Sequence, residues 1–251
     1  MYKLIFVLGS VLLLLSSPAF GQQEDDSYQR ELSYGINFNT NSRLIGGLMV
    51  KSTHRLRDKW YQFGVLEIVE IQHPKEQVLF NQETGGTFIK GKQNYLFSVR
   101  PQYGREHVLF KKAPESGVQV NALFAGGPTI GLFVPYLINY DYGTVNGSPT
   151  TLPHPAIGVR TEQYNPSIHK EENTLGKAGV FRGLSQTNLQ LGANVKAAVS
   201  FEYGRYREGV TGVETGVVVE MYPGRPVLIP EAKNNVTYTS LYLTLYYGRR
   251  K

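Results

Sequence analysis

Five charged residues stand at every second position of segments whose other positions are apolar. They are Arg100, Lys196, Glu202, Glu214 and Glu220. Side chains along a β-strand point to opposite faces in turn, so each charge would face away from its apolar neighbours. Such groups could form a proton or ion path, or they could pair with one another. Because buried charges persist only when they are paired, we favour a structural ladder, with Lys196 and Arg100 as the bases for Glu214 and Glu220.

The histidines offer little support for catalysis or metal binding. None of the five lies at the centre of a predicted strand, and none has a serine two residues further on: His54, His73, His107, His154 and His169. His169 and Glu172 have the spacing of two ligands on one helix face, but a single pair is a weak signal. There is no phosphate-binding glycine loop and no nucleophile elbow. We therefore predict no catalytic residue, no metal site and no cofactor.

The elements that would position the charges are β-strands. The last segment shows the pattern most clearly, with Leu241, Leu243 and Leu245 on one side and Ser240, Tyr242, Thr244 and Tyr246 on the other. Similar alternation or apolar runs occur in seven further segments, which are Leu32–Asn39, Leu44–Lys51, Trp60–Gln72, Asn94–Gly104, Gly117–Tyr140, Asn188–Tyr203 and Val213–Met221. Strands with one apolar and one polar wall are typical of transmembrane β-barrels.

The beginning of the chain has the three parts of a secretory signal peptide. Lys3 supplies a positive start, and residues 4–15 form an apolar run that is too short to cross a bilayer. Ala19 and Gly21 are the small residues that a signal peptidase reads, so we expect residues 1–21 to be removed before Gln22. No cysteine is present, and no later apolar run is long enough for a membrane helix.

Residues 22–251 are expected to form an all-β, antiparallel, up-and-down transmembrane barrel of eight strands. Bacterial barrels of one chain have even strand numbers, short periplasmic turns and longer outer loops. Counting back from the C-terminus places 39–42, 74–90, 141–185 and 223–234 outside, and 53–58, 111–115 and 204–208 inside. This count treats 117–140 as one strand bent at Gly126, Gly127 and Pro128. Two strands there would require ten in total.

Glu67 interrupts the apolar side of the third segment, which carries Tyr61, Phe63 and Val65. If that side faces lipid, a charge at its centre is costly. We therefore expect Glu67 to mark a bulge or the edge of the membrane.

The net charge of +6 arises from bases dispersed in turns and in the C-terminal tail of Arg249, Arg250 and Lys251. No basic helix or aromatic-basic motif is present, so we expect no nucleic-acid partner. The expected partners are outer-membrane lipid and other outer-membrane proteins. Loop 141–185 is the candidate for partner binding, through Tyr164, Asn165, Pro166 and His169, although it could equally be a variable loop that only covers the barrel mouth.

Several motifs together resemble small outer-membrane β-barrel proteins of Bacteroidota. They are Gly127–Leu132 followed by Pro135 and Tyr136, Gln163–His169, Phe201–Gly204, Glu214–Val219, and Leu245–Arg249. The resemblance covers most of the chain after residue 21. It implies a barrel in the cell outer membrane and brings no activity or catalytic residue with it.

Three functional hypotheses follow. The favoured one is a non-enzymatic outer-membrane barrel with a structural or interaction role, such as an accessory subunit of an assembly or export complex. The second is a lipid-modifying enzyme or protease of the outer membrane. The third is a soluble periplasmic barrel that binds an apolar ligand, as lipocalin-like folds do.

Overall fold

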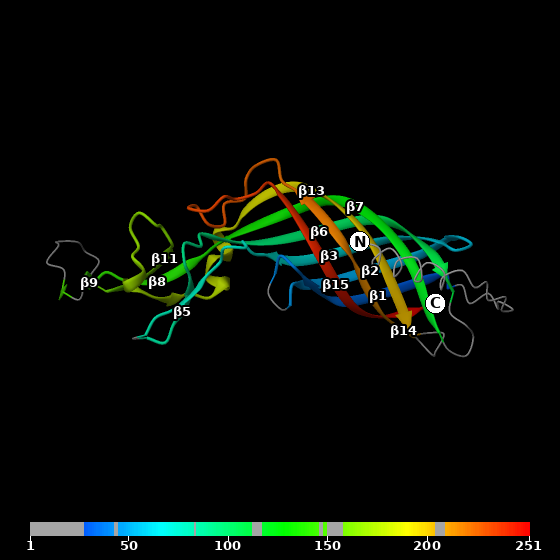
Figure 1. The fold of residues 1–251 in the computed structure, drawn as a ribbon, viewed down its shortest axis with the longest axis horizontal. Coiled ribbons are helices and arrows are strands. Elements are labelled where there is room, and N and C mark those ends of the chain that lie inside the picture. Colours follow the sequence, from blue (N-terminus) through cyan, green and yellow to red (C-terminus); the bar gives the residue numbers. More distant parts are fainter. Residues whose placement is uncertain are drawn as a thin grey trace, which may run out of the picture.

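The computed structural model describes residues 28–42, 45–82, 84–111, 117–145, 148–149, 158–203 and 209–251. Eight strands close into an antiparallel barrel with the order β1-β15-β14-β13-β7-β6-β3-β2 (Figure 1). Neighbours in the barrel are neighbours along the chain, so the predicted up-and-down topology with eight strands is confirmed. The strands are β1 (Arg30–Asn39), β2 (Gly47–Arg57), β3 (Trp60–Ile71), β6 (Asn94–Phe110), β7 (Val118–Pro135), β13 (Asn188–Tyr203), β14 (Gly209–Met221) and β15 (Thr237–Arg250).

β2 and β6 are longer than the sequence pattern predicted. We expected a turn over residues 53–58, but β2 continues through Arg57 and the turn to β3 is only Asp58 and Lys59. Lys59 has a φ of 59°, the left-handed conformation that such a tight turn requires. β6 likewise runs to Phe110 instead of ending at Gly104. In both strands, polar residues near the end interrupt the alternation of apolar and polar residues, and for this reason the sequence pattern predicted a shorter strand.

β7 is one continuous strand, as the eight-stranded count required. Its pairing with β6 is interrupted between Val99↔Ile130 and Tyr103↔Gly126, and the unchanged register places Pro101 opposite Pro128. Neither proline has an N–H for the ladder. Asn194 of β13 compensates, because its amide donates to the carbonyl oxygens of Gly127 at 3.2 Å and Pro128 at 3.0 Å.

The barrel part of this segment ends at Pro135, earlier than expected. The N–H of Tyr136 still donates to Gln93 O at 2.8 Å, whereas its carbonyl accepts from Tyr164 N at 3.3 Å. Tyr136 is therefore the point at which the chain passes from the barrel wall into the structure above it. The next residues form β8 (Leu137–Asp141), which belongs to a separate sheet.

The connections at one end of the barrel build what we call the outer lobe. It contains a three-stranded sheet of order β11-β8-β12 and a hairpin of β4 (Val78–Phe80) and β5 (Thr87–Ile89). Its other elements are β9 (Thr144–Val145), β10 (Ser148–Pro149), β11 (Val159–Gln163), β12 (Thr174–Lys177) and the 3-10 helices η1 (Glu171–Asn173) and η2 (Val180–Gln186). The lobe projects along the barrel axis away from the end that holds the C-terminus (Figure 1).

The hairpin is fastened to the sheet by close backbone contact. A Cβ at Gly86 would lie 2.1 Å from Leu175 O, so only glycine permits this approach. Thr84 Oγ1 donates to Leu175 O at 2.7 Å, and Asn81 Nδ2 donates to Thr174 O at 3.0 Å. Where the structure describes it, the segment 141–185 that was predicted to be a surface loop is thus a folded extension of the barrel.

The first described residues and the last residue of the chain meet at the opposite end of the barrel, which we call the terminal end. Gln29 and Arg30 donate their N–H groups to Lys251 O, at 3.0 and 2.9 Å. The expected signal peptide, residues 1–21, and the expected turn 204–208 lie outside the described residues.

Candidate functional site

All five charged residues singled out in the sequence face the barrel interior. Arg100, Lys196, Glu202, Glu214 and Glu220 are each at most 3% exposed. They come from β6, β13 and β14. The outward faces of β13 and β14 carry no charge, and that of β6 is apolar except toward the terminal end, where Arg105 and His107 lie. Period-two alternation alone places the five charged residues inside.

The centre of the interior is a chain of ion pairs. Lys196 Nζ lies 2.6 Å from Glu67 Oε1 and 2.7 Å from Glu214 Oε1, so one ammonium joins strands β13, β3 and β14. Arg100 Nε donates to Glu220 Oε2 at 2.8 Å, and its Nη1 lies 3.7 Å from Glu67 Oε2. Lys196 and Arg100 are thus the partners of Glu214 and Glu220.

Glu67 corrects one expectation. It marks neither a bulge nor a membrane edge, because β3 pairs with β2 and β6 without a register shift at this residue, and its side chain is fully buried in the lumen. The face of β3 that carries Tyr61, Phe63 and Val65 points inward, toward a core that mixes apolar residues with charges. The outward face carries Leu66 and Ile68.

A second group of ion pairs lies nearer the terminal end and was missed in the sequence. Lys51 Nζ is 3.1 Å from Glu106 Oε2 and 3.7 Å from Glu214 Oε2. Arg250 pairs with Glu31 at 2.7 Å and also with Glu202. Arg250 is therefore not part of a solvated tail, and Lys196 and Arg100 are not the only bases inside. Continuing the strand alternation to Lys51 and Arg250 would have found both.

We call these two groups of ion pairs together the lumen network. Clusters of aromatic and apolar side chains close the barrel interior at both of its ends. At the terminal end the guanidinium of Arg250 lies 3.9 Å from the ring centroid of Tyr28, which stacks on Tyr61 at 4.5 Å. At the lobe end a buried cluster spans the opening, formed by Ile71, Leu96, Phe133, Tyr222, Leu228 and Tyr238. The arrangement fits a structural ladder inside a filled barrel better than an ion path.

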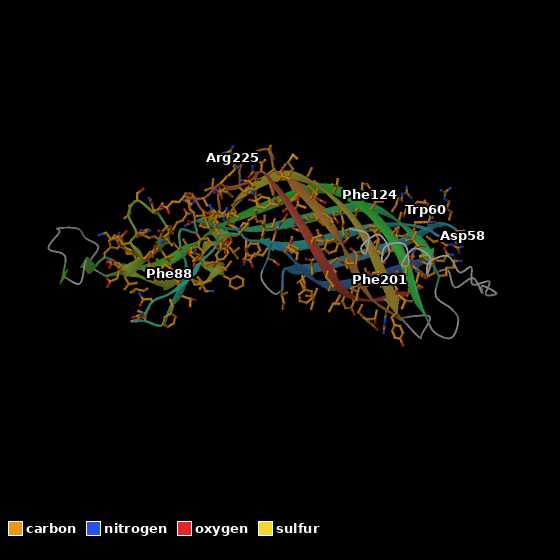
Figure 2. The ribbon with its side chains drawn as sticks, viewed as in Figure 1. Asp58, Trp60, Phe88, Phe124, Phe201 and Arg225 are labelled. Atoms are coloured by element: carbon orange, nitrogen blue, oxygen red, sulfur yellow. The ribbon has the colours of Figure 1, made fainter. Side chains whose placement is uncertain are left out.

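The exterior of the barrel is apolar. The outward positions of β7, β13 and β14 carry no charge, and many of the outward side chains are large and exposed; Phe124 and Phe201 on the outer wall are labelled in Figure 2. The registers place Tyr34, Tyr247 and Tyr203 in one row across the strands, near their ends at the terminal end of the barrel, through Tyr34↔Tyr247, Tyr247↔Thr211 and Tyr203↔Thr211. An apolar belt with tyrosines at its border is the pattern of a lipid-facing barrel wall.

In the outer lobe, His169 is the centre of a hydrogen-bonded group. Its Nδ1 accepts from the backbone N–H of Asn165 at 2.9 Å, so the proton of the neutral ring is assigned to Nε2. Nε2 lies 3.0 Å from Glu162 Oε1, which also accepts a hydrogen bond from the hydroxyl of Tyr142. The partner of His169 is thus Glu162 of β11, and Glu172, the other residue of the predicted pair, is exposed.

The remaining residues of the predicted binding loop shape this group. Asn165 Oδ1 accepts from Ser167 N at 3.0 Å, which closes a turn around the half-buried Pro166. Tyr164 packs among buried aromatics, and burial raises its pKa. Burial and the hydrogen bond to Glu162 raise the pKa of Tyr142 to about 12. These contacts fix the shape of the loop, in which Asn165 and Pro166 are half-buried. A role of these residues in partner binding stays a prediction.

The other histidines are separate from one another. His54 and His107 lie near strand ends, and His107 stacks on Trp60 at a centroid distance of 4.4 Å. His73 lies in the connection after β3 and contacts Lys233 O at 3.3 Å. His154 lies outside the described residues. Within the described ranges, no three His, Asp or Glu side chains group as a metal site would require.

Comparisons with known proteins give only distant structural likenesses. No protein-family model and no curated protein sequence matches the chain. Ail, the attachment invasion locus protein of Yersinia pestis, is similar with a TM-score of 0.39 and 8% identity over 90% of this chain and 100% of that chain. Its complex with the heparin analogue sucrose octasulfate gives a TM-score of 0.38 and 8% identity over 88% and 96%.

Neisserial surface protein A gives a TM-score of 0.32 and 10% identity over 88% of this chain and 94% of its own. At TM-scores this low, the likenesses carry no argument about what this chain binds. The resemblance to barrels of Bacteroidota stays a prediction. No helix in the described part of the chain has the length and apolar character to cross a membrane.

Proposed function

We propose that this protein is a non-enzymatic β-barrel of the bacterial outer membrane that anchors its outer lobe at the cell surface. One observation supports this proposal above all others. The outside of the barrel is an apolar belt, whereas the inside holds ion pairs such as Lys196–Glu67 and Arg100–Glu220. A soluble ligand-binding barrel would need the opposite distribution, with a polar outside. This inversion argues against the lipocalin-like alternative.

The direction of insertion follows from the two ends of the barrel. The terminal end has the short turn at Asp58 and Lys59, whereas the lobe end has the long connections. Short turns face the periplasm and long loops face outward in bacterial barrels. The outer lobe then lies outside the cell, where it is available to other outer-membrane proteins.

The geometry of His169 argues against the enzyme alternative. Both ring nitrogens are engaged, Nδ1 with the Asn165 backbone and Nε2 with Glu162. The hydroxyl of Tyr142 lies 3.4 Å from Nε2, and it donates to the same carboxylate. These hydrogen bonds connect β11 to the turn that follows it, so we infer a structural role for His169. Envelope lipid composition that is unchanged by His169→Ala would agree with this view.

The proposal is tested by locating both ends of the barrel in cells. The chain has no cysteine, so single cysteines report position without background. Val159→Cys lies on the exposed part of the lobe, and Asp58→Cys lies at the turn of the terminal end. We expect both variants in the outer-membrane fraction, with only Val159→Cys labelled by an impermeant maleimide in intact cells.

Asp58→Cys should react only after the cells are permeabilised, which makes it the matched control. Recovery of the protein in the soluble periplasm would contradict the membrane location. Labelling of Asp58→Cys alone in intact cells would contradict the orientation. The interaction role is tested separately, by asking which outer-membrane proteins cross-link to a photoreactive residue at position 159 and not to one at position 58.

A further inference from the structure

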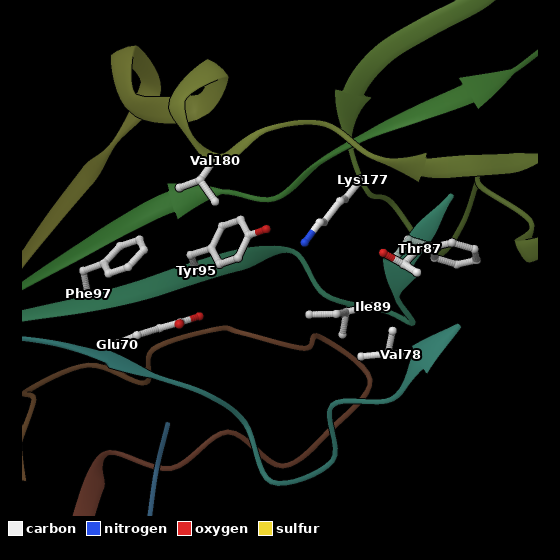
Figure 3. Close-up of a pocket in the computed structure, with 9 residues that line it drawn as sticks. Glu70, Val78, Thr87, Ile89, Tyr95, Phe97, Lys177 and Val180 are labelled. Carbon is white, nitrogen blue, oxygen red and sulfur yellow. The ribbon is translucent and has the colours of Figure 1, made fainter. Parts of the chain in front are cut away.

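A small pocket lies where the outer lobe meets the barrel rim, apart from the lumen network. Its volume is about 200 Å³. Its walls come from β3, β6, the hairpin β4–β5, β12 and η2 (Figure 3). Because five separate parts of the fold converge on it, the pocket is a product of the assembled lobe and not of one loop.

The pocket holds two opposite charges that are not paired with each other. The carboxylate of Glu70 and the ammonium of Lys177 both point into the space (Figure 3). Glu70 accepts a hydrogen bond from Gln72 Nε2 at 3.0 Å. Within the part of the chain that the structure describes, neither residue forms an ion pair with the other or with a third group. Two opposite charges held apart across a cavity are complementary to a ligand that carries both charges.

Most of the remaining wall is apolar, with Thr87 and the hydroxyl of Tyr95 as its other polar groups, and parts of it are held in place. Ile89 is buried, and its N–H donates to Tyr136 Oη at 2.8 Å. The ring of Tyr95 is held from one side by Lys92, whose Nζ lies 4.5 Å from the ring centroid. Val180 covers the pocket from η2. A mostly hydrophobic and aromatic lining with a small number of polar groups is the usual composition of a small-molecule site.

We propose that this pocket binds a compact zwitterion, with its ammonium group at Glu70, its anionic group at Lys177 and a small apolar portion against Ile89 and Val180. The volume suits a ligand smaller than the drug-sized molecules that fill pockets of about 300–1,000 Å³. Free α-amino acids with apolar side chains have this chemistry, and so does the phosphoethanolamine headgroup of a lipid. The inference goes beyond the anchoring role, because it depends on the pocket and not on where the barrel resides.

The test is isothermal titration calorimetry on the full-length protein, folded in detergent micelles, with leucine and with phosphoethanolamine as probes. Two analogues of leucine serve as ligand controls: 4-methylpentanoate, which lacks the ammonium group, and 3-methylbutylamine, which lacks the carboxylate. We expect a zwitterion to bind about tenfold or more tightly than either analogue, because a lost charged hydrogen bond costs at least that much in affinity.

Lys177→Met and Glu70→Gln should each weaken zwitterion binding by about tenfold or more. Lys170→Met is the matched control, since Lys170 is an exposed lysine of the same lobe that does not line the pocket. Retained migration of the unboiled protein on a denaturing gel shows that each variant is folded. Binding of leucine alone identifies a free amino acid as the ligand, and binding of phosphoethanolamine alone identifies a lipid headgroup.

The proposal is overturned if the folded protein binds neither zwitterion. It is also overturned if both pocket variants bind as the wild type does, or if a singly charged analogue binds equally well. None of these outcomes bears on the membrane location, which the cysteine experiment measures independently.

Discussion

Several charged side chains inside the barrel each pair with more than one oppositely charged side chain. Glu67 stands between Lys196 and Arg100, and Lys196 stands between Glu67 and Glu214. A buried charge is tolerated only with a partner, and removal of one partner leaves the other uncompensated. Stability should therefore depend much more on these pairs than on similar pairs at the surface.

Arg100→Met should destabilise the barrel by about 3–5 kcal/mol, because it leaves Glu220 buried without its cation. The double variant Arg100→Met with Glu220→Leu should recover a large part of this loss. Urea unfolding in lipid vesicles, followed by Trp60 fluorescence, measures the change. Lys90→Met is the control, since it removes the exposed pair with Glu171 and should leave the free energy of unfolding nearly unchanged. Equal losses at both sites would contradict the buried ladder.

The phenol of Tyr142 should ionise late in an alkaline titration. Its pKa is raised to about 12 by burial and by its hydrogen bond to Glu162, from an ordinary value near 10. Since the folded-state pKa is raised, the related stability is present below pH 10 and is lost as the pH rises from about 10 toward about 12. The difference between the ultraviolet titrations of wild type and Tyr142→Phe should isolate one phenol titrating near pH 12. An ionisation near pH 10 would show that the hydrogen bond between Tyr142 and Glu162 is not formed.

The sequence predicted the direction of individual side chains where a whole strand alternates. Lys196 and Glu214 follow from β13 and β14, whose outward residues are all uncharged. Glu67 was placed wrongly because the lumen is filled with apolar residues as well as charges, so the inward face of β3 resembles a lipid face. A single strand cannot resolve that ambiguity, since the assignment depends on which residues lie across the barrel.

At the level of elements, strands were easier to predict than the lobe. Barrel strands repeat the same alternation, which is a local property of the chain. The sheet β11-β8-β12 is built from strands of four or five residues that pair over long distances in the sequence. Such short segments show almost no periodic signal. Their pairing depends on contacts such as Gly86 against Leu175, which only the folded lobe reveals.

Gly86→Ala should loosen the lobe without opening the barrel. The added Cβ would lie 2.1 Å from Leu175 O, a backbone atom that cannot turn aside, so the hairpin must move away from β12. Overpacking of this kind costs about 1–3 kcal/mol. Hydrogen exchange should accelerate at β4, β5 and β12 and remain slow in β13 and β14.

Gly179→Ala is the matched control for this prediction, because a Cβ at Gly179 would meet no atom within 4 Å and the residue has no positive φ. Its exchange should equal that of the wild type. Uniformly faster exchange across the barrel strands in Gly86→Ala would show that lobe and barrel do not unfold independently.

The whole molecule joins a filled, closed barrel to a lobe at one of its ends. Closure could be predicted from the even strand count and from the alternation of short and long connections. The height of the lobe above the barrel rim could not be predicted, because it depends on where the chain leaves the barrel wall, at Tyr136, to form β8. At this scale a closed barrel wall carries a separately folded lobe at one of its ends.

The barrel should not conduct as a porin does. Eight strands give an interior just wide enough for side chains to fill, whereas porins with open channels have about 16–18. Here the lumen network occupies the centre, and aromatic clusters around Tyr28 and Tyr222 close the two mouths. In planar-bilayer recordings the purified protein should show no stable, porin-sized conductance steps, while a trimeric porin in the same lipid serves as the positive control. Regular steps of porin size would mean that the ion pairs part to leave a water-filled path, and the structural ladder would have to be abandoned in favour of an ion pathway.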